Sequence, residues 1–168
     1  MSVGSNINPE ENVREAIRRL GRQVRIVGLS TFYRDQAEGR PEQPAFYNGV
    51  VEVETEMPAA ELKRGVLRRI EQELGRKRTE DKYAPRTIDL DILVYGDLAV
   101  TTGDLVIPDP QIPHRPFLAI PLHELAPELV LPGLEVAVRE IAARFADHKM
   151  EPLKDYTKLL RGDIEHGS

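Results

Sequence analysis

Two aspartates, Asp89 and Asp91, are the residues of this sequence best suited to chemistry. In an extended strand, residues two positions apart point to the same face and lie about 6.5–7 Å apart along the backbone. Two carboxylates so close repel each other unless a cation lies between them. Mg²⁺ prefers such oxygen ligands and often shares them with phosphates. The spacing therefore predicts a Mg²⁺ site, and the alternative is an ordinary solvent-facing strand surface.

Basic residues precede the two aspartates. Residues 63–86 include nine basic and four acidic side chains, a net charge of +5, although the whole chain has a net charge of −5. Such a local block in an acidic protein indicates a discrete anionic ligand. Guanidinium groups bind phosphate oxygens in fixed, often bidentate geometry, so Arg76, Arg78 and Arg86 are candidate phosphate ligands. Three other cations of the block, Lys63, Arg64 and Lys77, are interpreted as a solvated face.

Aromatic residues are scarce, and two of them stand where a flat ring could be bound. Phe46 and Asn48 alternate on a predicted strand and so share a face, and Phe117 follows a proline-rich loop and Arg115. Core packing is the ordinary role of a phenylalanine. Two aromatic rings can also sandwich a heterocycle, whose polar edge Asn48 could then bind.

The composition excludes several classes of function and argues against others. The chain has 168 residues, which suits one domain, and it has no cysteine for disulfides or thiol catalysis. Its four histidines show no metal-ligand spacing, and no Walker-type glycine-rich loop is present. The net charge argues against general nucleic-acid binding. With no long apolar run and no signal peptide at the start, we expect a cytoplasmic protein without a membrane contact.

The elements that must position these residues follow the order β-α-β-β-α-β. We predict a strand ending at residue 3, a helix capped by Asn8 and ending at Gly21, strands over 24–32 and 46–55, a helix over 58–75 and a strand over 87–95. This order is that of the ferredoxin-like α+β motif, an antiparallel sheet with flanking helices.

The rest of the chain is predicted to add smaller elements to this core. An edge strand is expected over 101–107, followed by a short helix over 117–125 and a further helix over 135–145. Residues 1–145 are therefore expected to form the functional domain. The charged and weakly periodic residues 146–168 are interpreted as a loosely held C-terminal tail.

Residues 82–93, KYAPRTIDLDIL, resemble the signature of the 6-hydroxymethyl-7,8-dihydropterin pyrophosphokinase family. Other segments agree with that family in order, and the resemblance extends from Gly4 to Pro132. They are GSN at 4–6, STFYR at 30–34, FYNGVV at 46–51 and RPFL at 115–118.

The resemblance implies an enzyme that transfers pyrophosphate from ATP to the pterin hydroxymethyl group, giving AMP and the pterin pyrophosphate in folate biosynthesis. Asp89 and Asp91 would hold two Mg²⁺ ions, and the partners would be ATP and the hydroxymethyl-dihydropterin, bound by a monomer. The other implied roles are phosphate neutralisation by Arg76, Arg78 and Arg86, nucleotide contact by Glu71, pterin stacking by Phe46 and Phe117, edge recognition by Asn48, and loop closure by Arg115.

One departure from the family pattern concerns Asp109, which stands where the family usually has a histidine that approaches ATP phosphate. An aspartate there would repel phosphate, and His114 is a candidate to compensate. Asp109 therefore leaves open the alternative of a pterin-binding protein that has lost catalysis. A second alternative, based on the fold, is a ferredoxin-like module that binds nucleotide or RNA without catalysis.

Overall fold

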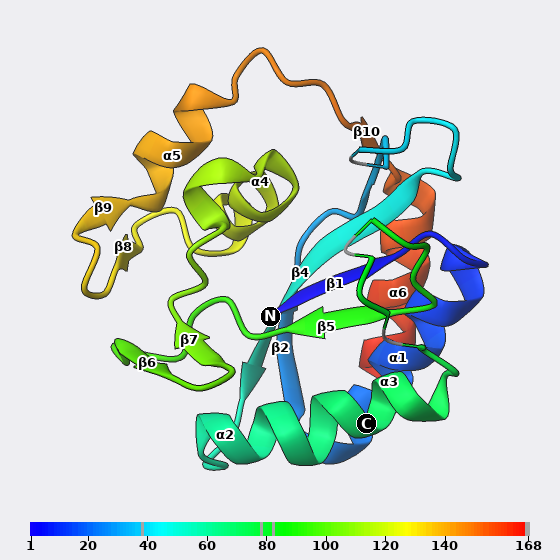
Figure 1. The fold of residues 1–168 in the computed structure, drawn as a ribbon, viewed down its shortest axis with the longest axis horizontal. Coiled ribbons are helices and arrows are strands. Elements are labelled where there is room, and N and C mark those ends of the chain that lie inside the picture. Colours follow the sequence, from blue (N-terminus) through cyan, green and yellow to red (C-terminus); the bar gives the residue numbers. More distant parts are fainter. Residues whose placement is uncertain (38, 78, 82, 167–168) are drawn as a thin grey trace.

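An antiparallel sheet is at the centre of the computed structural model, which describes residues 1–166 apart from residues 38, 78 and 82. Its strands follow the order β10-β3-β4-β1-β5, and β2 also pairs with β4 (Figure 1). Each of these pairings is antiparallel. The strands are β1 (Ser2–Ser5), β2 (Arg25–Leu29), β3 (Tyr33–Asp35), β4 (Phe46–Glu54), β5 (Asp89–Asp91) and β10 (Glu151–Pro152). The expected antiparallel sheet with flanking helices is confirmed.

Helices cover both faces of this sheet. The helices are α1 (Pro9–Gln23), α2 (Ala59–Glu61), the π-helical stretch η1 (Leu62–Leu67), α3 (Arg68–Glu73), the 3₁₀ turn η2 (Ile112–His114), α4 (Pro116–Leu125), α5 (Val138–Arg144) and α6 (Lys154–His166). Two small hairpins lie outside the sheet, β6 (Val100–Thr102) with β7 (Leu105–Ile107) and β8 (Val130–Leu131) with β9 (Val136–Ala137).

Alternation along β4 divides the interior into two cores. Val51 belongs to the larger core, which α1, the α2–α3 helix and α6 complete on one face. Val50 belongs to the smaller core on the other face, where it is buried with Leu118 and Leu122 of α4. Because successive strand residues point to opposite faces, even-numbered residues of β4 face α4. Phe46 and Asn48 therefore share the α4 face.

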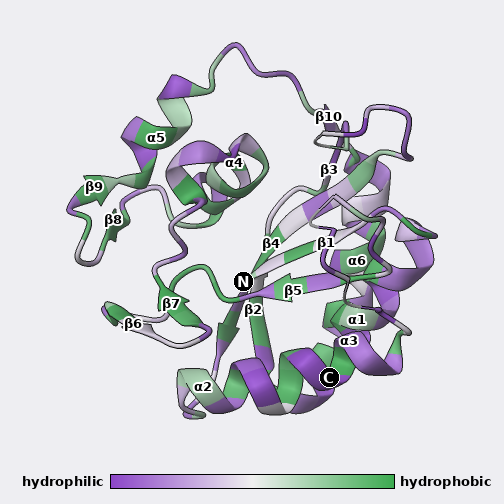
Figure 2. Ribbon diagram, in the orientation of Figure 1, coloured by the Kyte–Doolittle hydropathy of each residue, from purple (hydrophilic) through white to green (hydrophobic). Residues whose placement is uncertain are grey.

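The two main helices follow the predicted apolar spacing. Val13, Ala16, Ile17 and Leu20 are all buried on α1, which continues past Gly21 to Gln23. The predicted helix over 58–75 is present from α2 to α3, and apolar and polar residues alternate around it (Figure 2). Its middle is π-helical, an insertion that is often associated with functional sites.

Three predicted strands differ in extent from the observed ones. The strand expected over 24–32 ends at Leu29, because the backbone N–H of Phe32 donates instead to Thr157 Oγ1 at 2.9 Å. The strand expected over 87–95 is reduced to β5, because β1 offers it partners only from Ser2 to Gly4. Residues 101–107 form the β6–β7 hairpin and not a single edge strand.

The prediction of a loosely held C-terminal tail is wrong. β10 pairs with the edge of β3, and α6 packs on α1 with Thr157 and Leu160 buried (Figure 1). The backbone N–H of Leu153 donates to the Phe32 carbonyl at 2.8 Å. The C-terminal segment therefore also binds the residues between β2 and β3. The pattern of α6 was overlooked because few of its positions are apolar. No helix among the described residues is long and apolar enough to cross a membrane.

We expect Leu160→Ala to lower the free energy of unfolding by about 3 kcal/mol, because truncating a fully buried leucine loses contacts and leaves a cavity. Leu159 is the matched control, since its side chain is 44% exposed on the next position of the same helix. Urea denaturation of both variants measures the difference. Equal effects of the two substitutions would show that α6 does not belong to the core.

Candidate active site

Strand register brings the predicted site residues into one row. Gly4 of β1 lies opposite Asn48 of β4 on one side and opposite Asp89 of β5 on the other. Directly opposed residues of an antiparallel sheet point to the same face, so Asn48 and Asp89 both lie on the α4 face. A Cβ on Gly4 would come within 2.5 Å of Asn48 Oδ1. The space above Gly4 is therefore taken up by the Asn48 amide, which only a glycine at this position permits.

Two of the three predicted phosphate ligands bind Asp89 itself. Arg76 Nη1 donates to Asp89 Oδ1 at 2.9 Å, and Arg86 Nη1 donates to Asp89 Oδ2 at 2.8 Å. The side chain of Arg76 is only 10% exposed, whereas that of Asp89 is 36% exposed. The structure thus confirms that arginines and aspartate converge. Arg78, the third predicted phosphate ligand, lies outside the described residues.

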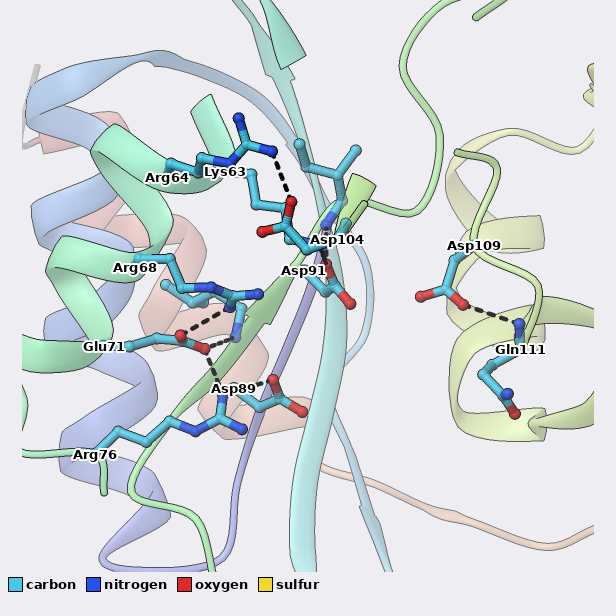
Figure 3. Close-up of polar contacts among 12 residues, drawn as sticks. Lys63, Arg64, Arg68, Glu71, Arg76, Asp89, Asp91, Asp104, Asp109 and Gln111 are labelled. Atoms are coloured by element: carbon cyan, nitrogen blue, oxygen red, sulfur yellow. Dashed lines mark hydrogen bonds and ion pairs between the residues drawn. The ribbon is translucent and has the colours of Figure 1, made fainter. Parts of the chain in front are cut away.

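Glu71 is a buried acid whose side chain is only 2% exposed. It accepts hydrogen bonds from Arg68 Nη1 at 3.0 Å, from Arg76 Nη1 at 2.5 Å and from the backbone N–H of Leu90 at 3.0 Å. Figure 3 shows this carboxylate between the two arginines, on the helix side of β5. Glu71 therefore links α3 to β5 and orients Arg76, while its expected contact with nucleotide stays a prediction.

Asn6 positions the backbone of Arg86, a role that sequence reasoning missed. Asn6 is buried, its Oδ1 accepts from the Arg86 N–H at 2.8 Å, and its own N–H donates to the Arg86 carbonyl at 3.1 Å. Its side-chain Nδ2 donates to Gln43 Oε1 at 3.2 Å and to the Pro44 carbonyl at 3.3 Å. The GSN run at residues 4–6 thus connects β1, the loop before β4 and the strand that follows Arg86.

The second aspartate, Asp91, lies in a more crowded environment. Its side chain is 41% exposed, and burial together with the negative charge of Asp109 raises its pKa to about 6. Lys63 acts in the opposite direction from a distance of 3.9 Å between Nζ and Asp91 Oδ1. The interpretation of Lys63 as a solvated residue is wrong, because it is only 8% exposed.

The two aspartates fit the chemistry of a Mg²⁺ site. Both present oxygen donors on one face of β5, and both remain partly open to solvent. Among the described residues, no group of three or more acids or histidines is arranged to enclose a metal ion. An ion held by Asp89 and Asp91 would therefore complete its shell with phosphate oxygens and water, as Mg²⁺ does at nucleotide sites.

The expected pterin residues are distributed over β4 and α4. Phe46 begins β4 and is half-buried, and Asn48 lies two residues further along the same face. Phe117 lies in the first turn of α4, where it is half-buried against the smaller core, and Arg115 directly precedes that helix. Because α4 packs on β4, these residues share one side of the sheet. Their contacts with a pterin stay predictions.

Residues 1–127 match the family model of 7,8-dihydro-6-hydroxymethylpterin-pyrophosphokinase, and the chain belongs to this family. A 2-amino-4-hydroxy-6-hydroxymethyldihydropteridine pyrophosphokinase of Haemophilus influenzae is 37% identical over 153 residues, which cover 89% of this chain and 94% of that protein. A protein of the same name from Synechocystis is 40% identical over 79% of this chain and 68% of its own length. The folic acid synthesis protein fol1 of Pneumocystis carinii is 33% identical over 91% of this chain, which corresponds to 21% of that longer protein.

Proposed function

We propose that the sheet edge around Asp89 and Asp91 is where this chain performs the reaction of its family, the transfer of pyrophosphate from ATP to 6-hydroxymethyl-7,8-dihydropterin in folate biosynthesis. The products are AMP and the pterin pyrophosphate. The observation that carries the proposal is the convergence of Arg76 and Arg86 on Asp89, on the same face as Asn48. Asp91 follows two residues later on that face.

Positioning and charge neutralisation are the main demands of this reaction. The substrate hydroxyl is a weak nucleophile and the phosphate chain is strongly anionic, so no covalent intermediate with the protein is required. Arg76 and Arg86 neutralise phosphate charge, and we propose the same for Arg78. For Arg115, which directly precedes α4, we propose a part in closing the loop over the reactants. Asp89 and Asp91 hold Mg²⁺, two ions in our proposal, which when bound polarises the phosphates and aligns them with the hydroxyl.

The pterin side of the site is proposed on the α4 face of the sheet. Phe46 and Phe117 stack on the two faces of the ring, and Asn48 hydrogen-bonds its polar edge. The position of the Asn48 amide supports this placement, because it lies over Gly4, the residue between Asn48 and Asp89 in the sheet. A pterin bound there has its hydroxymethyl group directed toward the metal-binding aspartates.

Further proposals concern the sheet topology, the roles of the two parts of the chain, and the oligomeric state and location of the enzyme. The pairing of β1 with both β4 and β5, and of β4 with β2, supports a ferredoxin-like arrangement of the core. We propose that residues 1–145 supply all substrate contacts and that residues 146–168 support them. We also propose that the enzyme acts as a monomer in the cytoplasm.

Pterin-dependent turnover of ATP tests the proposed function. We expect ATP consumption in the presence of Mg²⁺ only when 6-hydroxymethyl-7,8-dihydropterin is added, and its loss when Mg²⁺ is chelated. Binding of the pterin without any turnover would favour the alternative of a non-catalytic pterin-binding module. Absence of both binding and turnover would contradict the proposed function.

We expect Mg²⁺-dependent nucleotide binding to weaken as the pH falls from 7.5 toward 5. The pKa of Asp91 is raised to about 6, first by burial and then by Asp109, so its carboxylate takes up a proton in this range and stops binding metal. Folding stability depends on pH in the opposite direction to nucleotide binding, because the pKa of Asp91 in the folded state lies above its value in the unfolded chain. Protonation of Asp91 stabilises the fold at low pH, and this contribution is lost as the pH rises through about 6.

Titration of an ATP analogue with wild type and Asp91→Asn between pH 5 and 8 measures this dependence. ATP phosphate itself titrates in the same range, so the ratio of the two dissociation constants isolates Asp91. The ratio should approach 1 at pH 5 and grow toward pH 8. A ratio that does not change with pH would show that Asp91 does not titrate in this way.

A further inference from the structure

Lys63 is a buried cation near the site to which no role has been given. Its Nζ donates to the backbone carbonyl of Asp104, in the turn of the β6–β7 hairpin, and lies 3.9 Å from Asp91 Oδ1. The side chain is 10% exposed, against 58% for its neighbour Arg64, which pairs with the Asp104 carboxylate at 2.7 Å. Burying a lysine is costly unless its charge is paired. The burial of Lys63 therefore implies that its charge is paired with a specific anion.

The π-helical stretch η1 places this lysine, the second of its six residues, beside β5. A π turn adds a residue to the helix and locally changes the direction in which side chains point. Here Lys63 is directed at Asp91 while Arg64 stays at the surface (Figure 3). The two adjacent cations thus differ in environment, and this makes Arg64 a matched control for Lys63.

Asp109 approaches the same place from the opposite side. Its backbone N–H donates to the Leu93 carbonyl at 2.8 Å, and its Oδ1 accepts from the Gln111 N–H at 2.8 Å, which fixes the loop that bears it. Figure 3 shows its carboxylate facing Asp91 across the open side of β5. Burial raises the pKa of Asp109, and Lys63 opposes the rise at Asp109 as it does at Asp91. One lysine therefore acts on both carboxylates.

We propose that Lys63 is a positioning residue of the nucleotide-phosphate site, where its charge offsets that of Asp109 and holds Asp91 in place. The inference rests on the proposed function, because the ligand it concerns is the triphosphate of ATP. Without compensation, Asp109 adds negative charge where phosphates must bind. With Lys63 present, its positive charge cancels one of the two negative charges of the facing carboxylates. The remaining negative charge is small enough for a metal-bound triphosphate to approach.

Nucleotide binding in a double-mutant cycle tests this compensation. The probe is an α,β-methylene analogue of ATP, whose α,β-bridge cannot be cleaved. It is titrated in the presence of Mg²⁺ by calorimetry. We expect Lys63→Met to weaken binding about tenfold, since one favourable charge is removed and the Asp91 carboxylate loses a cationic partner. Asp109→Asn should tighten binding about threefold, and in that background Lys63→Met should weaken binding only about threefold. The double variant should therefore bind about as tightly as wild type, whereas independent effects would leave it roughly threefold weaker and contradict the compensation.

Conservative and neighbouring variants separate this role from a structural one. Lys63→Arg should retain binding within about threefold, and Arg64→Met, which removes a surface charge one residue away, should change it less than twofold. Binding by Lys63→Met within twofold of wild type, or a double variant as weak as Lys63→Met, would overturn the proposal. If Lys63→Met does not fold, then adding Asp109→Asn must restore a folded protein, and failure to do so overturns the proposal equally. Loss of pterin-dependent turnover in wild type would instead contradict the proposed function.

Discussion

Asp89→Asn is expected to lower the rate of pterin-dependent AMP formation about a thousandfold. The amide keeps the shape of the side chain but removes the negative charge that holds a metal ion against the phosphates. It also removes one charged partner from each of Arg76 and Arg86, whose guanidinium groups now bind its two oxygens at 2.9 and 2.8 Å. Steady-state AMP release, with nucleotide and Mg²⁺ saturating for wild type, measures the effect.

Asp97→Asn is the control for this substitution, because Asp97 is an exposed aspartate shortly after β5. It should keep the wild-type rate within a factor of about two. Thermal unfolding of both variants separates loss of activity from loss of fold. A rate for Asp89→Asn within tenfold of wild type would rule out Asp89 as a metal ligand of the reaction.

Arg76→Met is expected to lower kcat about a hundredfold and to raise the KM for ATP. Arginines that neutralise phosphate charge in the transition state have effects of this size or larger. Because the Arg76 side chain is almost fully buried, we also expect a loss of about 2 kcal/mol in unfolding free energy, since Glu71 loses an arginine partner.

Arg25→Met provides the matched control for Arg76. Arg25 is 78% exposed and pairs with Glu54 at 3.5 Å at the far end of β2. Kinetics and urea denaturation of this variant should be close to wild type, since exposed ion pairs contribute little to stability. A fall in stability without any change in kcat for Arg76→Met would make Arg76 a purely structural residue.

Much of the site could be predicted from local sequence, because its spacing is local. The alternation of Asp89 and Asp91 requires only a strand, and the structure provides three residues of it. Arg86 reaches Asp89 from three positions before it, within the same segment. Gly4 could be recognised as part of a motif, although its role between Asn48 and Asp89 depends on a register that links three strands.

The features that sequence analysis missed depend on contacts between distant segments. The carboxylate of Glu71 accepts from the backbone N–H of Leu90 across 19 positions of sequence, while its contact with nucleotide stays a prediction. Lys63 is buried because a π turn directs it toward a carbonyl 41 residues away. Contacts of α6 span an even larger sequence separation: the backbone N–H of Phe32 donates to Thr157 across 125 positions. Local composition contains no signal for such pairings.

The identity of the nucleotide product tests the central claim most directly. Phosphorus NMR of a reaction containing the protein, ATP, Mg²⁺ and 6-hydroxymethyl-7,8-dihydropterin distinguishes the possible phosphate products. We predict equal amounts of AMP and a pterin with two phosphates, both absent when the pterin is omitted. Formation of ADP with a singly phosphorylated pterin, or of AMP without any phosphorylated pterin, would contradict a pyrophosphate transfer at this site.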